Sequence, residues 1–312
     1  MIPAPLMNEV SEILGGEGYL VGGSVRDKIL GRPVKDFDFC TPMLPDDIEA
    51  AVRKAGKKPH LAGKRFGTVG FKSQGEDVEI TTFRTELYVP GDRKPEVQYT
   101  NDLNLDLARR DFTMNAMALD FDGNLIDPFG GQNALDDRMI HSVGLGLDRI
   151  SEDPLRMLRA VRFVSQLGFD INENFIDEIM DQRHLLMTVS RERWGQELDK
   201  FMLGSYTQKG MVALKSTGLM QMMFPELNSA AGWAHSAFIG FHMGFLPLDA
   251  DVRWAFLMRE IGNLHGTCDQ SRSTATALIS EGISARMRFS NQRTKLVKEN
   301  LLLPPAHKGL WN

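Results

Sequence analysis

The hydrophobic pattern changes its period once along the chain, near residues 140–150, and this change limits the possible folds most. Before it, short apolar runs typical of β-strands are separated by Gly, Pro and Asp. These runs lie at 18–21, 37–40, 68–72, 78–83 and 116–121, with helical patterns at 26–30 and 45–55. After residue 151 nearly all apolar residues recur at helical spacing. We therefore expect an α+β fold, in which a small mixed β-sheet with helices precedes an all-helical remainder.

Local signals predict several boundaries. The segment 73–76 is typical of a hairpin connection between the third and fourth strands. In the helical part, Ser151 is the expected N-cap of a long helix that Gly168 ends. Further helices are expected at 173–180, 191–202, 211–219, 252–259 and 274–283.

Composition restricts the class of protein. The 312 residues include 36 Lys and Arg against 41 Asp and Glu, a net charge of −5 that argues at first against a nucleic-acid partner. At roughly 100–200 residues per domain, this length predicts two or three domains. Cys40 and Cys268 lie far apart, which argues against a disulfide framework. With no apolar run of the ~18–20 residues that span a bilayer and no signal-peptide pattern, we expect a cytoplasmic protein without a membrane partner.

A strand that runs into Gly22 and Gly23 and then into a helix start is typical of a phosphate-binding turn. The glycines let backbone N–H groups approach an anion, the helix start adds partial positive charge, and Arg26 adds a full one. Ser24 belongs to the same turn. Gly-Gly turns between strand and helix are also common as purely structural features, so this motif does not decide the function alone.

Asp36 and Asp38 make the phosphate hypothesis stronger. Residues i and i+2 of a strand point to the same side, so both carboxylates face one site. They repel each other unless a cation holds them, and oxygen ligands suit Mg²⁺. Two ions ~4 Å apart in such a site activate a hydroxyl and neutralise a leaving pyrophosphate. Glu79 joins the site if its strand neighbours theirs. The alternatives are a solvated acidic strand edge for the pair and a solvated strand position for Glu79.

Arg110 and Asp111 precede an apolar run. Arg110 suits a phosphate or a ribose edge and Asp111 suits ribose hydroxyls, whereas a salt-bridge cluster at a helix start is the alternative.

Asp153 and Arg156 lie three residues apart on one helix face. The carboxylate accepts from an exocyclic amine and the guanidinium donates to ring N and O atoms, which mimics a Watson–Crick edge. Arg159 and Arg162 continue a basic stripe suited to a triphosphate or an RNA backbone. An intrahelical salt bridge with solvated arginines is the usual alternative.

Together these motifs resemble the class II tRNA nucleotidyltransferase and bacterial poly(A) polymerase family. The matching segments are GGSVRD at 22–27, LG at 30–31, DFD at 36–38, RRDFTMNA at 109–116 and EDPLR at 152–156. The similarity follows the family order over about 18–230. It implies a nucleotidyltransferase-fold head at 1–137, then an all-α neck at 138–205, a body at 206–255 and a short RNA-binding tail at 256–312.

The resemblance also implies roles. Asp36 and Asp38 are similar to the catalytic residues that hold Mg²⁺, and 22–26 to the turn that grips the triphosphate. Arg110 and Asp111 resemble the ribose-contacting pair.

In the neck, Asp153 and Arg156 resemble the protein template that selects CTP or ATP. The segment 85–104 resembles the family's flexible loop, with breaks at Pro90, Gly91 and Pro95.

The chain departs from its relatives late in the sequence. It has no His-Asp dipeptide, so we expect no HD-domain metal site. A basic cluster is suited to an RNA backbone, with a solvated helix face as the alternative. Its members are Arg286, Arg288, Arg293, Lys295 and Lys298.

The resemblance therefore implies a Mg²⁺-dependent, template-independent enzyme that adds C, C and A to the 3′ end of tRNA from CTP and ATP and releases pyrophosphate. The alternatives are an enzyme that adds only CC or only A, a poly(A) polymerase, and a non-catalytic RNA-binding protein on the same scaffold.

Overall fold

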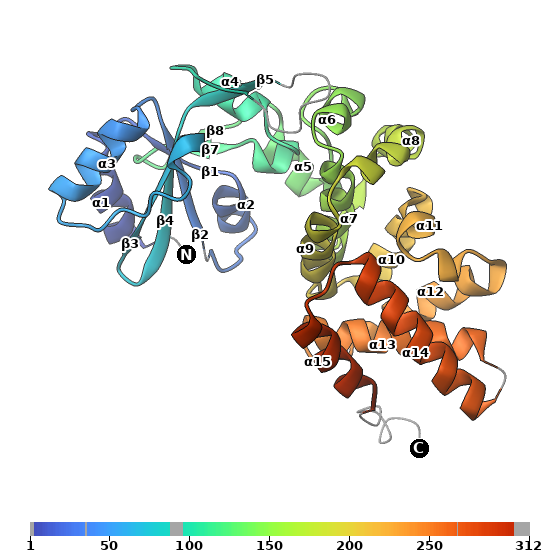
Figure 1. Ribbon diagram of the computed structural model, residues 1–312. Helices are drawn as coiled ribbons and strands as arrows, with labels where there is room; N and C mark the ends of the chain where they lie inside the picture. Colours follow the sequence, from blue (N-terminus) through green and yellow to red (C-terminus); the bar gives the residue numbers. More distant parts are fainter. Residues whose placement is uncertain (1–2, 35, 88–95, 267, 303–312) are drawn as a thin grey trace. The chain divides into compact units, whose positions relative to one another are not determined.

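The computed structural model describes residues 3–34, 36–87, 96–266 and 268–302. The chain divides into two compact units, Met1–Leu145 and Gly146–Asn312. The first unit holds the sheet and the second is helical, as the change of hydrophobic period predicts (Figure 1). The finer division of the helical part into neck, body and tail stays a prediction.

A six-stranded sheet in the order β3-β4-β2-β1-β7-β8 forms the first unit. The strands are β1 (Tyr19–Val21), β2 (Asp36–Thr41), β3 (Thr68–Ser73), β4 (Glu76–Thr82), β7 (Ala118–Leu119) and β8 (Leu125–Ile126). β2 and β4 are parallel, whereas the other neighbours run antiparallel, so the sheet is mixed as expected. A parallel pair needs a crossover, which α3 and β3 supply.

The turn between β3 and β4 confirms the predicted hairpin. Ser73 pairs with Glu76, which leaves a two-residue loop. Gln74 and Gly75 both have positive φ, 52° and 87°. Positive φ at both loop residues matches the twist of antiparallel strands.

The first unit contains five helices among its described residues. They are α1 (Ala4–Ile13), α2 (Gly23–Ile29), α3 (Pro45–Lys54), α4 (Leu103–Ala108) and α5 (Gly131–Asp136), with 3-10 turns η1 (Lys64–Phe66) and η2 (Thr113–Asn115). α3 lies against β3 and β4, α1 lies against α3, and α2 contacts β1 and β2 (Figure 1). β9 (Met139–Ile140) follows α5.

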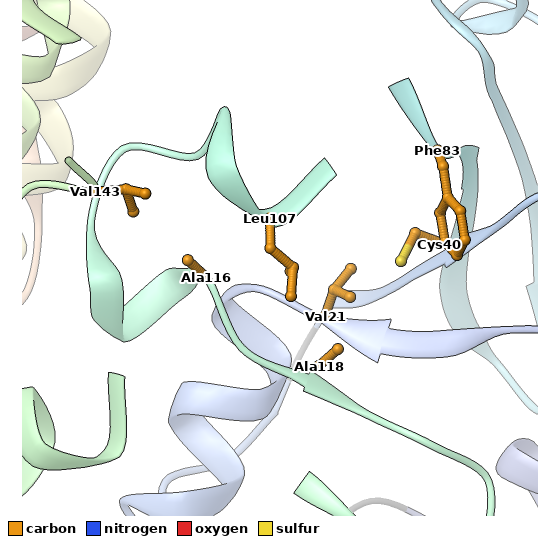
Figure 2. Packing of buried hydrophobic residues seen from close by; sticks show 7 residues of the cluster. All are labelled: Val21, Cys40, Phe83, Leu107, Ala116, Ala118 and Val143. Atoms are coloured by element: carbon orange, nitrogen blue, oxygen red, sulfur yellow. The ribbon is translucent and has the colours of Figure 1, made fainter. Parts of the chain in front are cut away.

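A buried cluster joins α4 to the sheet. Figure 2 shows Leu107 of α4 together with Val21 of β1, Cys40 of β2 and Ala118 of β7. Burial raises the pKa of the Cys40 thiol, which therefore stays neutral and packs as an apolar group. Because α4 is packed here, the residues at its C-terminal end have a fixed place relative to β1 and β2.

Of the segment 85–104, expected as a flexible loop, the structure describes 85–87 and 96–104. β5 (Arg84–Leu87) and β6 (Glu96–Tyr99) pair antiparallel, and α4 begins at Leu103. Pro90, Gly91 and Pro95 lie outside the described residues.

The second unit contains ten helices in the described part of the chain, with the short strand β10 (Asp170–Ile171) and the 3-10 turns η3 (Arg183–Thr188) and η4 (Pro225–Leu227). The helices are α6 (Gly146–Glu152), α7 (Leu155–Leu167), α8 (Glu173–Gln182), α9 (Arg191–Met202), α10 (Thr207–Ser216), α11 (Leu219–Met223), α12 (Ala230–Met243), α13 (Ala250–His265), α14 (Asp269–Arg286) and α15 (Asn291–Leu302). The five later helices predicted from periodicity are all present, and α9 has the predicted bounds, whereas the bounds of the other four differ.

The expectation that Ser151 caps a helix is wrong. Ser151 lies inside α6, where its hydroxyl donates to the Leu147 carbonyl at 2.9 Å. α7 begins at Leu155, after Pro154. Proline lacks the N–H that would continue α6 and disfavours a helical residue before it, so the pattern is split into two helices. Gly168, with φ +74°, ends α7 as expected.

In the part of the chain that the structure describes, no helix combines the length and the apolar character needed to cross a membrane.

Candidate active site

The residues singled out in the sequence fall into two groups, one in each unit. The first begins where β1 ends at Gly22, whose backbone has φ 70° and ψ −133°, a region open to glycine. A Cβ atom at Gly22 would lie 2.8 Å from Nη1 of Arg110, and one at Gly23 would lie 3.4 Å from Nη2 of Arg26. The two glycines therefore let two guanidinium groups approach the turn.

Ser24 fastens this turn to the strand that carries the aspartates. Its buried hydroxyl donates to the Asp36 carbonyl at 2.6 Å and accepts from the Asp38 N–H at 3.4 Å. Residues 12 and 14 positions apart in the sequence are thereby held together, so the glycine turn and β2 form one site.

The carboxylates lie on the face of β2 that the core does not use. Phe37 and Phe39 are buried, whereas Asp36 is exposed and Asp38 is half-buried. Glu79 of β4 is directly opposite Asp38 in the parallel ladder. Glu79 was expected to join the site only if its strand neighbours that of the aspartates, and the two strands are neighbours.

The pKa of Asp38 shows the electrostatics of this face. Burial first, and then the charges of Glu79 and Asp36, raise it to about 6, while Arg110 opposes the rise. Both Asp38 and its acidic neighbours would be stabilised by a cation between them.

The donor set fits Mg²⁺ bound by few protein ligands. Within the described ranges, no three His, Cys, Asp or Glu side chains gather into a ready cage for a metal ion. Mg²⁺ commonly uses one or two carboxylates and takes its other ligands from water and substrate phosphates. Two aspartates beside a turn that admits guanidinium groups suit this form of binding.

A buried carboxylate that the sequence reasoning missed holds Arg110. Asp106 is 0% exposed, and its Oδ2 accepts from Arg110 Nη2 at 3.1 Å. Its Oδ1 accepts from Arg109 Nε and Nη2 at 3.0 and 2.8 Å. Burial opposes the charged form, but the two arginines outweigh it and the pKa of Asp106 is lowered. The i,i+4 spacing to Arg110 was the signal that could have found it.

Arg26 and Asp111 are linked through Asn115. Arg26 donates to Asn115 Oδ1 at 2.8 Å, and Asn115 Nδ2 donates to Asp111 Oδ1 at 3.0 Å. The same Asp111 oxygen accepts from the Phe112 N–H at 2.8 Å. Arg26 also forms a two-point ion pair with its neighbour Asp27. In this structure Asp111 thus has a local structural role, and Arg26 keeps a fixed orientation.

In the second unit, Asp153 and Arg156 each contact another partner. Arg193 of α9 donates to Asp153 Oδ2 at 2.8 Å. Arg156 is buried and donates to Glu152 Oε2 at 2.9 Å. The prediction that both residues lie on one helix face is wrong, because Asp153 lies between α6 and α7 while Arg156 is in α7. The expected acceptor and donor are present, and a different neighbouring side chain contacts each of them.

The expected basic stripe on α7 is partly internal. Arg162 is 7% exposed, and its Nε lies 3.2 Å from Oε2 of the buried Glu197 on α9. Arg159 lies 3.9 Å from the same carboxylate and is more accessible. Glu197 was missed because its partners lie on another helix, 35 and 38 residues earlier.

The late basic cluster is also divided. Arg286 pairs with Glu226 at 2.6 Å, and Arg293 pairs with both Asp199 and Asp251 at 2.7 and 2.8 Å. These two arginines tie α14 and α15 to other helices. The remaining members of the cluster are Arg288, Lys295 and Lys298, of which Lys295 is 79% exposed.

Comparison with known proteins adds independent information. The family model described as "Poly A polymerase head domain" matches residues 18–141. The one described as "Probable RNA and SrmB- binding site of polymerase A" matches residues 168–231.

Individual relatives agree with these matches. The chain is 41% identical to a CCA-adding enzyme of Geobacillus thermodenitrificans and 40% identical to one of Bacillus cytotoxicus. Each match covers 80% of this chain, which spans only 60% and 62% of the length of these relatives.

A solved structure is similar over nearly the whole chain. The Bacillus stearothermophilus CCA-adding enzyme in complex with CTP superposes with a TM-score of 0.70 and 30% identity. The match covers 98% of this chain and 80% of that protein. Since sequence, order of motifs and fold all agree, the chain belongs to the family of CCA-adding tRNA nucleotidyltransferases and bacterial poly(A) polymerases.

Proposed function

We propose that this chain adds C, C and A to the 3′ end of tRNA from CTP and ATP, without a nucleic-acid template, and releases pyrophosphate. The observation that carries the proposal is the bridge of Ser24 between the glycine turn and the Asp36–Asp38 strand. It joins the glycine turn, which suits a phosphate, to the strand that carries the two carboxylates. The relatives named CCA-adding enzymes, one of them in complex with CTP, support the choice of reaction.

In this proposal Asp36 and Asp38 hold Mg²⁺, with Glu79 beside them on β4. When bound, Mg²⁺ neutralises charge on the reacting phosphate and favours ionisation of the attacking hydroxyl. The 3′ oxygen of the RNA attacks the α-phosphorus, and the bond from that phosphorus to pyrophosphate breaks. One of these metal-bound carboxylates would accept the hydroxyl proton.

The arginines position the triphosphate. Arg110 and Arg26 lie against the glycine turn and present guanidinium groups to an anion bound there. Asp106 and Asn115 hold them in place, so their orientation is set before the substrate arrives. Such preorganised charge is the main contribution that a protein makes to this kind of transfer.

Nucleotide choice is assigned to Asp153 and Arg156. Arg193 and Glu152 hold the two side chains separately, which orients each one. To read a base edge, both must turn their remaining hydrogen-bonding capacity toward the nucleotide. Arg159, also on α7, is the accessible arginine suited to a phosphate, while Arg162 supports the helix through Glu197.

We also propose that the protein is located in the cytoplasm. Neither Cys40 nor Cys268 forms a disulfide, which fits a reducing compartment.

The test uses tRNAs that lack one, two or three terminal nucleotides, with Mg²⁺ and with CTP and ATP given singly and together. We expect the wild-type chain to restore C, C and A in order. Asp36→Ala and Asp38→Ala should each abolish incorporation of both nucleotides while RNA binding persists. Asp46→Ala, which removes a carboxylate that is 88% exposed in the same unit, is the matched control.

The pattern of products decides between the related activities. Addition of CC alone or of A alone would identify a partial-specificity enzyme, and long A tails would identify a poly(A) polymerase. If the wild-type chain adds nothing to any of the tRNAs, the proposed activity is wrong. Full incorporation by either aspartate variant would refute the metal site while leaving the activity in place.

A further inference from the structure

A strand outside the six-stranded sheet contributes a carboxylate to the arginines at the end of α4. β5 and β6 form a two-stranded sheet of their own, and β5 lies against α4 (Figure 1). Glu86 is on β5, and its side chain is only 11% exposed. It has no part in the metal or nucleotide sites described above. Because a carboxylate out of water is costly unless cations or hydrogen-bond donors surround it, the partners of Glu86 indicate its role.

Glu86 shares Arg109 with Asp106. Its Oε1 accepts from Arg109 Nη1 at 3.0 Å and from Arg84 Nη2 at 3.3 Å. The Nε and Nη2 atoms of Arg109 both donate to Oδ1 of Asp106. Burial opposes the charged form of Arg109, but the charges of Asp106 and then Glu86 outweigh it, and the pKa of Arg109 is raised. The Arg109 guanidinium therefore joins two carboxylates, one on β5 and one on α4.

The two oxygens of Asp106 have different partners. Oδ1 accepts from Arg109 and, at 3.3 Å, from the backbone N–H of Arg84 on β5. Oδ2 accepts from Arg110 Nη2 at 3.1 Å. Glu86 is a second charged acceptor for Arg109 and attracts it toward β5. Without the charge of Glu86, Arg109 would turn more of its donors to Asp106 and compete with Arg110 for Oδ2.

We propose that Glu86 is a positioning residue for the triphosphate. By holding Arg109 it leaves Oδ2 of Asp106 to Arg110, and Arg110 then stays beside Gly22. The contacts that connect Glu86 to Arg110 are charge-assisted hydrogen bonds of 3.0, 2.8 and 3.1 Å. The inference rests on the proposed function, in which Arg110 binds the triphosphate.

The test compares Glu86→Gln with the wild-type chain and with Glu96→Gln. Glutamine keeps the shape of the side chain and removes its charge. Glu96 is a matched control because it lies on β6, the partner strand of β5, and is exposed. CTP binding is titrated calorimetrically with Mg²⁺, and initial rates of CMP incorporation into tRNA that lacks its last three nucleotides give KM for CTP and kcat. Thermal melting identifies a temperature at which all variants are folded.

A double-mutant cycle separates positioning from a general structural role. In the Arg110→Gln background the group that Glu86 positions is absent, so Glu86→Gln should cause no further loss of CTP affinity. Arg109→Lys provides a second route to the same loss. It keeps the charge but removes the planar fork that joins the two carboxylates, and it should weaken CTP binding as Glu86→Gln does.

We expect Glu86→Gln to weaken CTP binding and to raise KM for CTP about three- to thirtyfold, with a smaller change in kcat, while Glu96→Gln behaves as wild type. Equal CTP affinities of the two variants would overturn the proposal, as would an undiminished loss from Glu86→Gln in the Arg110→Gln background. In both cases wild type still binds CTP, and the proposed function stands. If the wild-type chain binds no CTP, the proposed function fails together with this inference.

Discussion

Substitution of Gly22 by alanine tests whether the glycine is needed to leave room for the Arg110 guanidinium beside the turn. The backbone of Gly22 has φ 70° and ψ −133°, and an L residue there is strained by about 1–3 kcal/mol. The new Cβ would also lie 2.8 Å from Arg110 Nη1. The guanidinium is the flexible partner, so it must retreat by about 0.6 Å to reach an ordinary contact of 3.4 Å.

Gly31→Ala is the matched control. Gly31 also has a positive φ, +67°, but an added Cβ there meets nothing within 4 Å. Both variants should lose about 1–3 kcal/mol of stability, which is a fall of about 3–10 °C in Tm for a unit of this size. Only Gly22→Ala should move Arg110, and misplacement of a positioning group by up to 1 Å costs up to about 100-fold in rate.

The assay is the initial rate of CMP incorporation into tRNA that lacks its last three nucleotides, alongside thermal melting of both variants. We expect a loss of roughly 10- to 100-fold for Gly22→Ala and little change for Gly31→Ala, measured at a temperature where both are folded. CTP binding should weaken in parallel. Equal rates and equal CTP affinities for the two variants would show that Arg110 does not act from its place above the turn.

Three further predictions concern stability. Because folding raises the pKa of Asp38 to about 6, the charged carboxylate lowers the stability of the folded protein, and this loss grows as pH rises from about 4 to 6. Asp38→Asn should therefore melt at a higher temperature than wild type at pH 8 in metal-free buffer, and the difference should disappear near pH 4. A lower or equal Tm at pH 8 would contradict the repulsive environment. Folding lowers the pKa of Asp106, so the charged carboxylate stabilises the folded protein above the unfolded pKa of about 4, and this stabilisation is lost as pH falls below it. Asp106→Asn should cost about 3–5 kcal/mol of stability at pH 7 and progressively less in acid. Denaturation at several pH values measures this difference. At Gly262 an added Cβ would lie 2.0 Å from Thr276 Oγ1 between α13 and α14, whereas at Gly282 it meets nothing within 4 Å. Gly262→Ala should therefore lower Tm and Gly282→Ala should stabilise by about 0.5–1 kcal/mol, and the same sign for both would refute the packing argument.

Local patterns predicted the elements better than their ends. The alternation Asp36-Phe37-Asp38-Phe39 predicted which face of β2 is buried, and the structure confirms it. Periodicity found α9 with its bounds as observed. It failed at Ser151, where an apolar pattern continues across Pro154 although the backbone hydrogen bonding does not. The spacing of apolar residues predicts which side chains are buried, but it does not show that Pro154 lacks the backbone N–H a continuous helix needs.

The helix α12 was missed for a related reason. Its apolar and aromatic residues are spread over nearly all of its faces, and Phe238 and Phe241 remain exposed. In a helix without a polar face, apolar and polar residues do not alternate with the 3.6-residue period. An argument from that period therefore does not detect such a helix.

By itself the sequence determined the division into a sheet-bearing unit and a helical unit, the shared face of Asp36 and Asp38, and the hairpin at 73–76. Each of these follows from geometry within one element, where covalent structure sets the spacing of side chains. Tertiary structure alone decided that Glu79 lies opposite Asp38, that Arg110 is held above Gly22 by Asp106, and that Glu197 draws Arg162 inward. These contacts depend on which strands and helices pack together, and the packing of the whole core selects those partners.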